Sequence, residues 1–145
     1  MRSIPLSMAL AALLALPLHA EPATLTEGHA RTAYAGAPSG AAFLVLDNPG
    51  PDPLHLIGAR YDGAARVELH THLADSEGVM RMREVEGGFV IPPGGTLLMQ
   101  RGGDHVMFMG LSDPWADGDM IEIVLIFADG SEQAVAVPVQ IGAGE

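Results

Sequence analysis

The sequence predicts an all-β domain built as a β-sandwich, and three observations support this prediction. The 145-residue chain contains 18 glycines and 11 prolines, which interrupt it at short intervals. Between these turn residues lie short segments of apolar or alternating character, and no segment beyond the first 20 residues has a convincing helical period. Hydrophobic residues make up 48% of the chain, which is enough to bury a single core. We expect one domain of eight or nine short strands, with a closed barrel as the alternative architecture.

The first 20 residues differ in composition from the rest and predict a secretory signal peptide. Arg2 gives a short positive start, an apolar run covers residues 4–18, and Ala20 precedes Glu21. This order of charged, apolar and small residues predicts cleavage after Ala20. The expected organisation is a signal peptide at residues 1–20 and a single exported β-sandwich domain at residues 21–145. The apolar run is short for a membrane-spanning helix, and an uncleaved anchor is the alternative.

The first half of the domain contains four expected strands. Residues 41–46 form an apolar run that ends at the turn signal of residues 47–51, and residues 54–61 form a second apolar segment. In residues 66–73 the apolar and polar side chains alternate with the period of two expected for a strand. Val67, Leu69 and Leu73 face one way, and Arg66, Glu68, His70 and His72 face the other. Residues 79–85 follow after the turn at residues 75–78, so these two segments predict a hairpin.

The second half continues this rhythm. Residues 89–91 end at the turn Pro92-Pro93-Gly94-Gly95, and residues 96–100 end at Gly102-Gly103. The remaining expected strands are residues 105–111, 121–127 and 133–141, the last two separated by Asp129-Gly130. Such a series of short strands and turns is typical of a β-sandwich of immunoglobulin or cupredoxin type.

The charge and the absence of cysteine exclude several classes of function. The formal charge is −11, and it becomes −12 when Arg2 leaves with the signal peptide. Lysine is absent and the remaining arginines are scattered, so the chain has no basic stripe for nucleic acid or an anionic membrane surface. The acidic surface is expected to keep the protein soluble. With no cysteine, the sequence has no disulfide, no nucleophilic thiol and no lipid-modified cysteine.

Histidine and methionine are the remaining donors for a soft metal ion, and they occur in two notable pairs. Met80 and Met82 lie two residues apart, as do His105 and Met107. Residues two apart on a strand emerge from the same face about 6.6 Å apart at Cα, so each pair can reach one ion. His70 would add an imidazole from a neighbouring strand. A mixed His and thioether set favours Cu(I) over harder divalent ions.

Structural interpretations of these residues remain open at this point. Methionine is a common core residue, so Met99, Met109 and Met120 are interpreted as packing residues. Met80 and Met82 can also be the inward face of an amphipathic strand. His70 alone can be a solvated strand residue. His72 shares its face and can be a rim ligand, but we interpret it as a bystander, and His29 and His55 as surface residues.

Other copper proteins and enzymes fit the sequence less well. A blue-copper electron carrier holds its metal with a cysteine thiolate, which this chain lacks. An oxygenase with an N-terminal histidine brace would need histidine as the first mature residue, whereas the expected cleavage gives Glu21. The sequence has no G-x-S-x-G elbow and no evident pair of catalytic carboxylates. We do not expect an enzyme. The alternative is a non-catalytic exported β-sandwich that binds a protein partner.

Taken together, these residues resemble the PCuAC-type periplasmic copper chaperones. The resembling phrases are GAAFLVLDN, RVELH, GVMRMREVEGG, IPPGGTLLM, GGDHVMFMGL and GDMIEIVLIF, which span most of residues 40–139. The family motif is a His, a Met about ten residues later, and His-x-Met after about twenty more. It falls here on His70, Met82, His105 and Met107, with Met80 as the competitor for the second position. Two departures are Thr71, where some relatives have a further Met, and a C-terminal end without a Met- and His-rich tail.

The resemblance implies a cupredoxin-like β-sandwich that holds Cu(I) near its surface in the periplasm. It also implies that the protein passes copper to a respiratory oxidase subunit or to an assembly protein of that oxidase. We expect a monomer. Copper storage or detoxification with the same site is a variant of this function. Glu68 and Asp104 are candidates, by proximity in sequence, to orient the two imidazoles.

Overall fold

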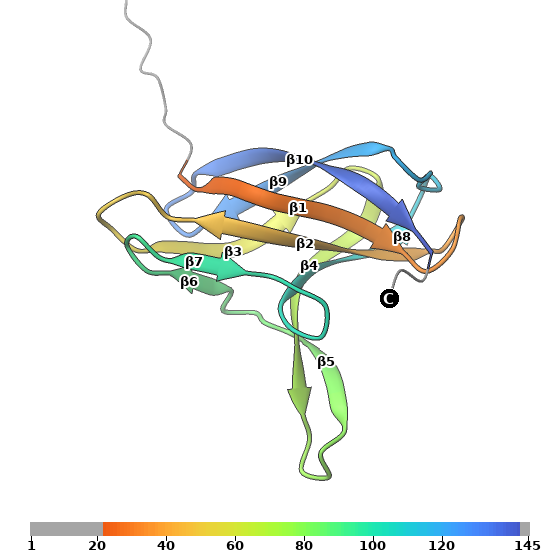
Figure 1. Cartoon of the computed structure of the whole chain (residues 1–145), viewed down its shortest axis with the longest axis horizontal. Helices are drawn as coiled ribbons and strands as arrows, with labels where there is room; N and C mark the ends of the chain where they lie inside the picture. The colour runs from red at the N-terminus through yellow and green to blue at the C-terminus, as the bar shows by residue number, and fades with distance from the viewer. Residues whose placement is uncertain (1–21, 143–145) are drawn as a thin grey trace, which may run out of the picture.

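The computed structural model describes residues 22–142, which form ten β-strands and no helix (Figure 1). The predicted signal peptide and the last three residues lie outside the described part. The strands are β1 (Thr24–Thr32), β2 (Ser39–Asp47), β3 (Leu54–Arg60), β4 (Ala64–Ala74), β5 (Met80–Glu84), β6 (Phe89–Ile91), β7 (Thr96–Leu98), β8 (His105–Leu111), β9 (Met120–Phe127) and β10 (Glu132–Ile141). Residues 22–142 contain no helix that could span a membrane.

The strands form one continuous path in the order β5-β4-β8-β2-β1-β10-β9-β3-β6, with β7 paired to β2 beside it. The pair β1–β10 is parallel, and the other pairs in the described part are antiparallel. The path has two free ends, β5 and β6, so the sheet is open. The closed-barrel alternative is therefore wrong.

The two halves of this sheet share one hydrophobic core. Leu44 of β2 and Phe108 of β8 belong to the first half, and Ile123 and Leu125 of β9 belong to the second; all four are fully buried. The same core cluster continues through the fully buried Val137 of β10. The predicted all-β sandwich is confirmed, with a core that draws on alternate residues of its strands.

Most of the expected strands are present, with small shifts at their ends, but β1 is missing from the sequence prediction. The reason is that β1 buries small residues. Ala30 is fully buried, and a Cβ at Gly28 would lie 2.7 Å from Cγ1 of Val137. A strand that packs closely through glycine and alanine has no pattern of large apolar side chains to reveal it.

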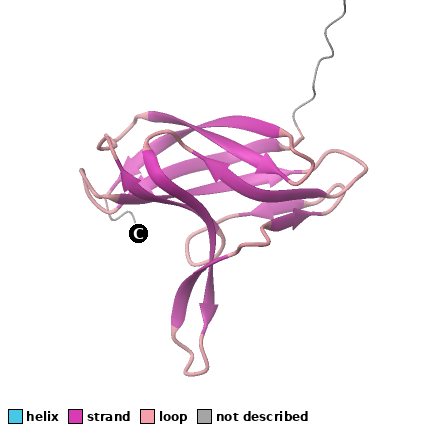
Figure 2. Ribbon diagram, turned by 180° about the vertical axis from the view of Figure 1, so that it is seen from behind, coloured by secondary structure: helices cyan, strands magenta, loops and turns pink. Residues whose placement is uncertain are grey.

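The hairpin of β4 and β5 extends beyond the body of the sandwich (Figures 1 and 2). Every residue of β5 is exposed, and Leu73 near the end of β4 is 51% exposed. Leu73 belongs to the same predicted face as Val67 and Leu69, but β4 has passed the edge of the core at that point. The first part of β4, which pairs with β8, therefore connects the hairpin to the sandwich.

Candidate metal site

Strands β4, β5 and β8 place histidine and methionine side chains on one face of the sheet. In the antiparallel register, His70 lies opposite His105, His72 opposite Met82, and Glu68 opposite Met107. Residues directly opposite each other on paired strands project to the same face. The other face of these strands carries core residues such as Leu69 and Val106. The sequence period of two therefore separates the candidate donors from the core.

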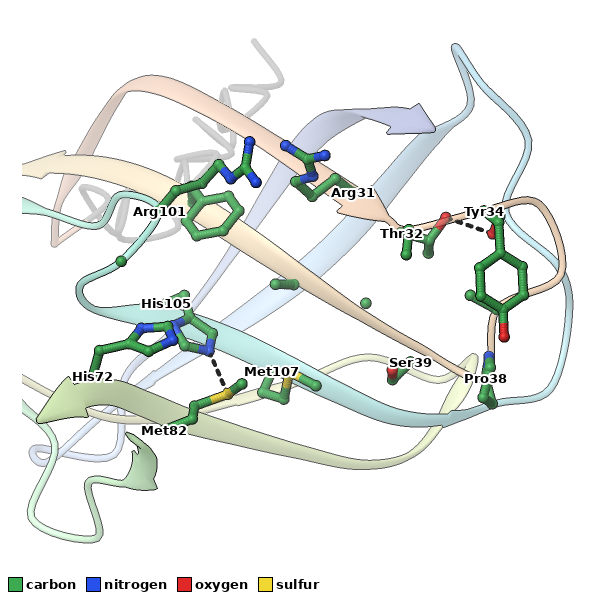
Figure 3. Close-up of a pocket in the computed structure, with 16 residues that line it drawn as sticks. Arg31, Thr32, Tyr34, Pro38, Ser39, His72, Met82, Arg101, His105 and Met107 are labelled. Atoms are coloured by element: carbon green, nitrogen blue, oxygen red, sulfur yellow. Dashed lines mark hydrogen bonds between the residues drawn. The ribbon is translucent and has the colours of Figure 1, made fainter. Parts of the chain in front are cut away.

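A cleft of about 540 Å³ opens on this donor face (Figure 3). Its sixteen lining residues include His72, Met82, His105 and Met107. Arg31 and Arg101 lie together at another side of the cleft. His70 is not among the lining residues. The cleft is thus lined by one thioether from the hairpin, one from β8, and two imidazoles.

His105 is the buried centre of this group, with only 2% of its surface exposed. Its Nδ1 lies 3.0 Å from the carbonyl oxygen of Gly103, and its Nε2 lies 3.1 Å from Sδ of Met82. Burial lowers the pKa of His105, with a further lowering from the neighbouring His70 and His72, while the bond to Gly103 opposes the shift. The ring is therefore neutral at pH 7 and carries one N–H.

The position of that proton follows from the partners of the two ring nitrogens. A carbonyl oxygen only accepts hydrogen bonds, so Nδ1 of His105 donates to Gly103. Nε2 then carries a lone pair, and it faces the sulfur lone pairs of Met82 at 3.1 Å. Two electron-pair donors turned toward each other are an arrangement that a soft cation would stabilise.

His70 lies beside His105, with 5.7 Å between the ring centroids. Its Nε2 lies 2.7 Å from Oε2 of Glu68, which accepts the ring proton, and the other carboxylate oxygen of Glu68 pairs with Arg66 at 2.7 Å. The opposite nitrogen of His70, Nδ1, is buried and has no hydrogen-bond partner among the described residues. A buried unpaired nitrogen is costly unless a ligand satisfies it. Bound metal would do so.

His72 also lies near His105, with 5.3 Å between the ring centroids. Its Nδ1 lies 3.3 Å from the same Gly103 carbonyl oxygen. One backbone oxygen therefore orients two imidazoles with Nδ1 protonated. Sequence reasoning missed this role because Gly103 contributes only its backbone.

The structure separates the remaining candidates. Met80 is 56% exposed and does not line the cleft, so Met82 is the methionine of β5 that reaches His105. The expectation for Asp104 is wrong, because its carboxylate accepts a bond from the hydroxyl of Thr71 at 2.7 Å instead of an imidazole N–H. Glu68 does contact a candidate imidazole, as expected.

Outside the cleft, the methionines and histidines have varied surroundings. Met99 is 2% exposed and belongs to the core, whereas Met120 is 63% exposed, so the expectation that Met120 packs inside is wrong. The ring of His29 contacts Phe43, and Nε2 of His55 bonds the carbonyl oxygen of Gly87. Within residues 22–142 no three His, Asp or Glu side chains are placed to hold a metal ion together.

Comparison with known sequences gives two matches. A family model described as "Putative lipoprotein LpqE-like" matches residues 23–139. The protein "Putative lipoprotein Lxx21020" of Leifsonia xyli subsp. xyli (strain CTCB07) is 40% identical over 106 residues, which cover 73% of this chain and 63% of that protein. This chain thus spans less than two thirds of the length of that relative.

Solved structures with the same fold include copper-bound forms. The solution structure of apo-DR1885 from Deinococcus radiodurans is 32% identical, with a TM-score of 0.64, and the match covers 98% of this chain and 93% of that one. The solution structure of CuI-DR1885 is 33% identical, with a TM-score of 0.59 over 90% of this chain and 83% of that one. The copper-bound PCuAC domain from PmoF2 is 19% identical, with a TM-score of 0.66 over 83% and 94%, which is a likeness of fold alone.

Proposed function

This chain belongs to the LpqE-like family of PCuAC-type domains, and on that premise we propose that it is an exported Cu(I) carrier. The family resemblance and the cupredoxin-like all-β fold expected from the sequence are both confirmed. One structural neighbour, CuI-DR1885, which is 33% identical, is a copper-bound protein, and this supports a role in binding copper over catalysis. We propose that the ion is held by His70, Met82, His105 and Met107.

The observation that carries this proposal is the approach of His105 to Met82. The neutral, buried imidazole of His105 presents an unprotonated Nε2 to the sulfur of Met82 at 3.1 Å. Hydrogen bonding does not account for this contact, because the single ring proton belongs to Nδ1 and Gly103. A soft cation bound by this nitrogen and this sulfur would stabilise the arrangement.

The other two proposed ligands complete a mixed set. Met107 lines the same cleft from β8, two residues after His105. His70 offers its buried Nδ1, and the carboxylate of Glu68 fixes the ring by accepting the Nε2 proton. Thioethers prefer Cu(I), and with no cysteine in the sequence there is no thiolate to compete for the ion. These residues supply binding and orientation, and no substrate chemistry is proposed.

We propose that the carrier works outside the cytoplasm and hands copper to another protein. The signal-like pattern of residues 1–20 and the lipoprotein name of the 40% identical relative support export, and we place the mature domain at residues 21–145 in the periplasm. The acceptor we propose is the copper centre of a respiratory oxidase or a protein that assembles it, and the carrier we propose is a monomer. Ligands at the wall of an open cleft can be replaced one at a time, so transfer does not require release of free copper.

The test is an anaerobic competition titration of the mature domain against a chromogenic Cu(I) chelator. We expect a 1:1 complex, and the variants His105→Leu and Met107→Leu should bind far more weakly than wild type. A protein that fails to compete at any ratio would refute the carrier function. Delivery is tested separately by mixing the loaded domain with a copper-free oxidase fragment and separating the two. Copper that stays on the carrier would favour storage.

A further inference from the structure

We propose that His72 is a copper donor at the mouth of the site, and that copper passes through it on entering and leaving. This inference rests on the proposed function. The family motif assigns no role to His72, which lies two residues after His70 on β4. The structure nevertheless places its ring as near to His105 as that of His70, at 5.3 Å against 5.7 Å.

The orientation of the His72 ring is the first support for this role. Its Nδ1 faces the Gly103 carbonyl oxygen at 3.3 Å, so this nitrogen is the donor and Nε2 carries the lone pair. His105 uses the same carbonyl in the same way, at 3.0 Å. The two rings are therefore held in the same tautomer by one oxygen. An imidazole whose opposite nitrogen is fixed in this way is prepared to bind a metal.

Access to the cleft is the second support. His72 lines the open cleft together with Met82, His105 and Met107, whereas His70 does not. The lone-pair nitrogen of His70, Nδ1, is buried. Figure 3 shows His72, Met82, His105 and Met107 together at the cleft. An incoming or departing ion is therefore expected to meet His72 and the two methionines before it reaches His70, which is not among the lining residues.

The third support is that the three imidazoles are not placed to bind one metal ion together. The ring centroids of His70 and His72 lie 5.7 Å and 5.3 Å from that of His105, but the described residues contain no three His, Asp or Glu side chains placed around a common metal position. In this proposal the rings of His72 and His70 act in succession. His105 and Met82 bind the ion in both positions. His72 is the further ligand while the ion is at the cleft, and His70, with its buried Nδ1, is the further ligand once the ion is bound in the site.

A residue used only in passage changes rates and leaves the equilibrium almost unchanged. We expect His72→Leu to slow both Cu(I) uptake and Cu(I) transfer to a chromogenic chelator by about tenfold, with the dissociation constant within about threefold of wild type. His72→Met should restore both rates, because a thioether also binds Cu(I). His70→Leu should instead weaken equilibrium binding. His55→Leu, which removes an imidazole outside the cleft, should change neither rate.

The measurement is stopped-flow transfer of Cu(I) from the loaded mature domain to the chelator, with equilibrium titrations of the same samples and circular dichroism to confirm folding. Transfer by His72→Leu within threefold of the wild-type rate would overturn the inference while leaving the carrier function intact. Equal slowing in His72→Leu and His72→Met would also overturn it, since the effect would then be structural. If wild type binds no Cu(I), the proposed function fails and this inference fails with it.

Discussion

Exchanging Met82 for leucine should separate copper binding from folding. Met82 is 45% exposed on a strand whose residues are all exposed, so Met82→Leu should change the free energy of unfolding by no more than about 0.5 kcal/mol. The same change removes the sulfur that lies 3.1 Å from Nε2 of His105. We expect Cu(I) affinity to fall at least about tenfold, which is about 1.4 kcal/mol.

Met99 provides the opposite case and Met80 the matched control. Met99 is 2% exposed in the core and outside the cleft, so Met99→Ala should cost about 2–5 kcal/mol of stability and leave the affinity of the folded protein unchanged. For a domain of this size that cost lowers Tm by roughly 6–20 °C. Met80→Leu removes an exposed thioether from the same strand without touching the cleft, and it should change neither quantity.

The assay combines thermal unfolding of the copper-free protein with anaerobic Cu(I) competition at a temperature at which every variant is folded. Parallel losses of affinity in the Met82, Met80 and Met99 variants would show that the loss does not come from a specific sulfur ligand. Wild-type affinity in Met82→Leu would be equally decisive, because the nitrogen–sulfur contact would then have no part in binding.

Three further predictions concern the surroundings of the site. Glu68→Gln should weaken Cu(I) binding by about tenfold, because an amide holds the His70 ring less firmly than a carboxylate does, while Asp104→Asn should have no effect in the same titration. Burial lowers the pKa of His105 in the folded protein below the value of 6.5 that a histidine has in the unfolded chain. As pH falls from about 7 to 5, the unfolded chain therefore binds a proton at this residue more readily than the folded protein does. The free energy of unfolding of the copper-free protein should decrease over this range. Denaturant titrations at several pH values should show a smaller decrease in the free energy of unfolding for His105→Gln than for wild type. An equal dependence on pH in the two proteins would contradict this prediction. Mild peroxide should oxidise the exposed Met82 to its sulfoxide and abolish Cu(I) binding. Mass spectrometry checks that Met82 is oxidised. Full Cu(I) affinity in the protein oxidised at Met82 would contradict the role of sulfur.

The period of two in the sequence was sufficient to place the donors on one face. His70 and His72 alternate with Leu69, and His105 alternates with the core residue Val106. The period of two could not distinguish Met80 from Met82, because residues two apart on β5 project to the same face. The choice depends on the register that sets His72 opposite Met82, which is a contact between strands.

Sequence proximity misled the prediction for Asp104. Asp104 lies in the loop just before β8, and its carboxylate accepts a hydrogen bond from the hydroxyl of Thr71 at 2.7 Å. The shared Gly103 carbonyl was also invisible, because every residue has a backbone oxygen and only the fold shows where it points.

The position of His72 in the cleft has a similar cause. From the sequence, His72 is one more polar residue toward the end of an amphipathic strand. The structure places it at the wall of the cleft because the loop before β8 brings the Gly103 carbonyl against both rings, and because the hairpin brings Met82 beside it. Neither contact is local in the sequence.

X-ray absorption at the copper edge of the anaerobic 1:1 Cu(I) complex is the sharpest test of the proposed His/Met site. We expect a reduced copper ion with both nitrogen and sulfur neighbours, and weaker sulfur scattering in Met82→Leu, which leaves Met107 as the remaining sulfur ligand. A copper ion with only nitrogen or oxygen neighbours would contradict the proposed site, because the contact between His105 and Met82 would then have no role in holding the metal.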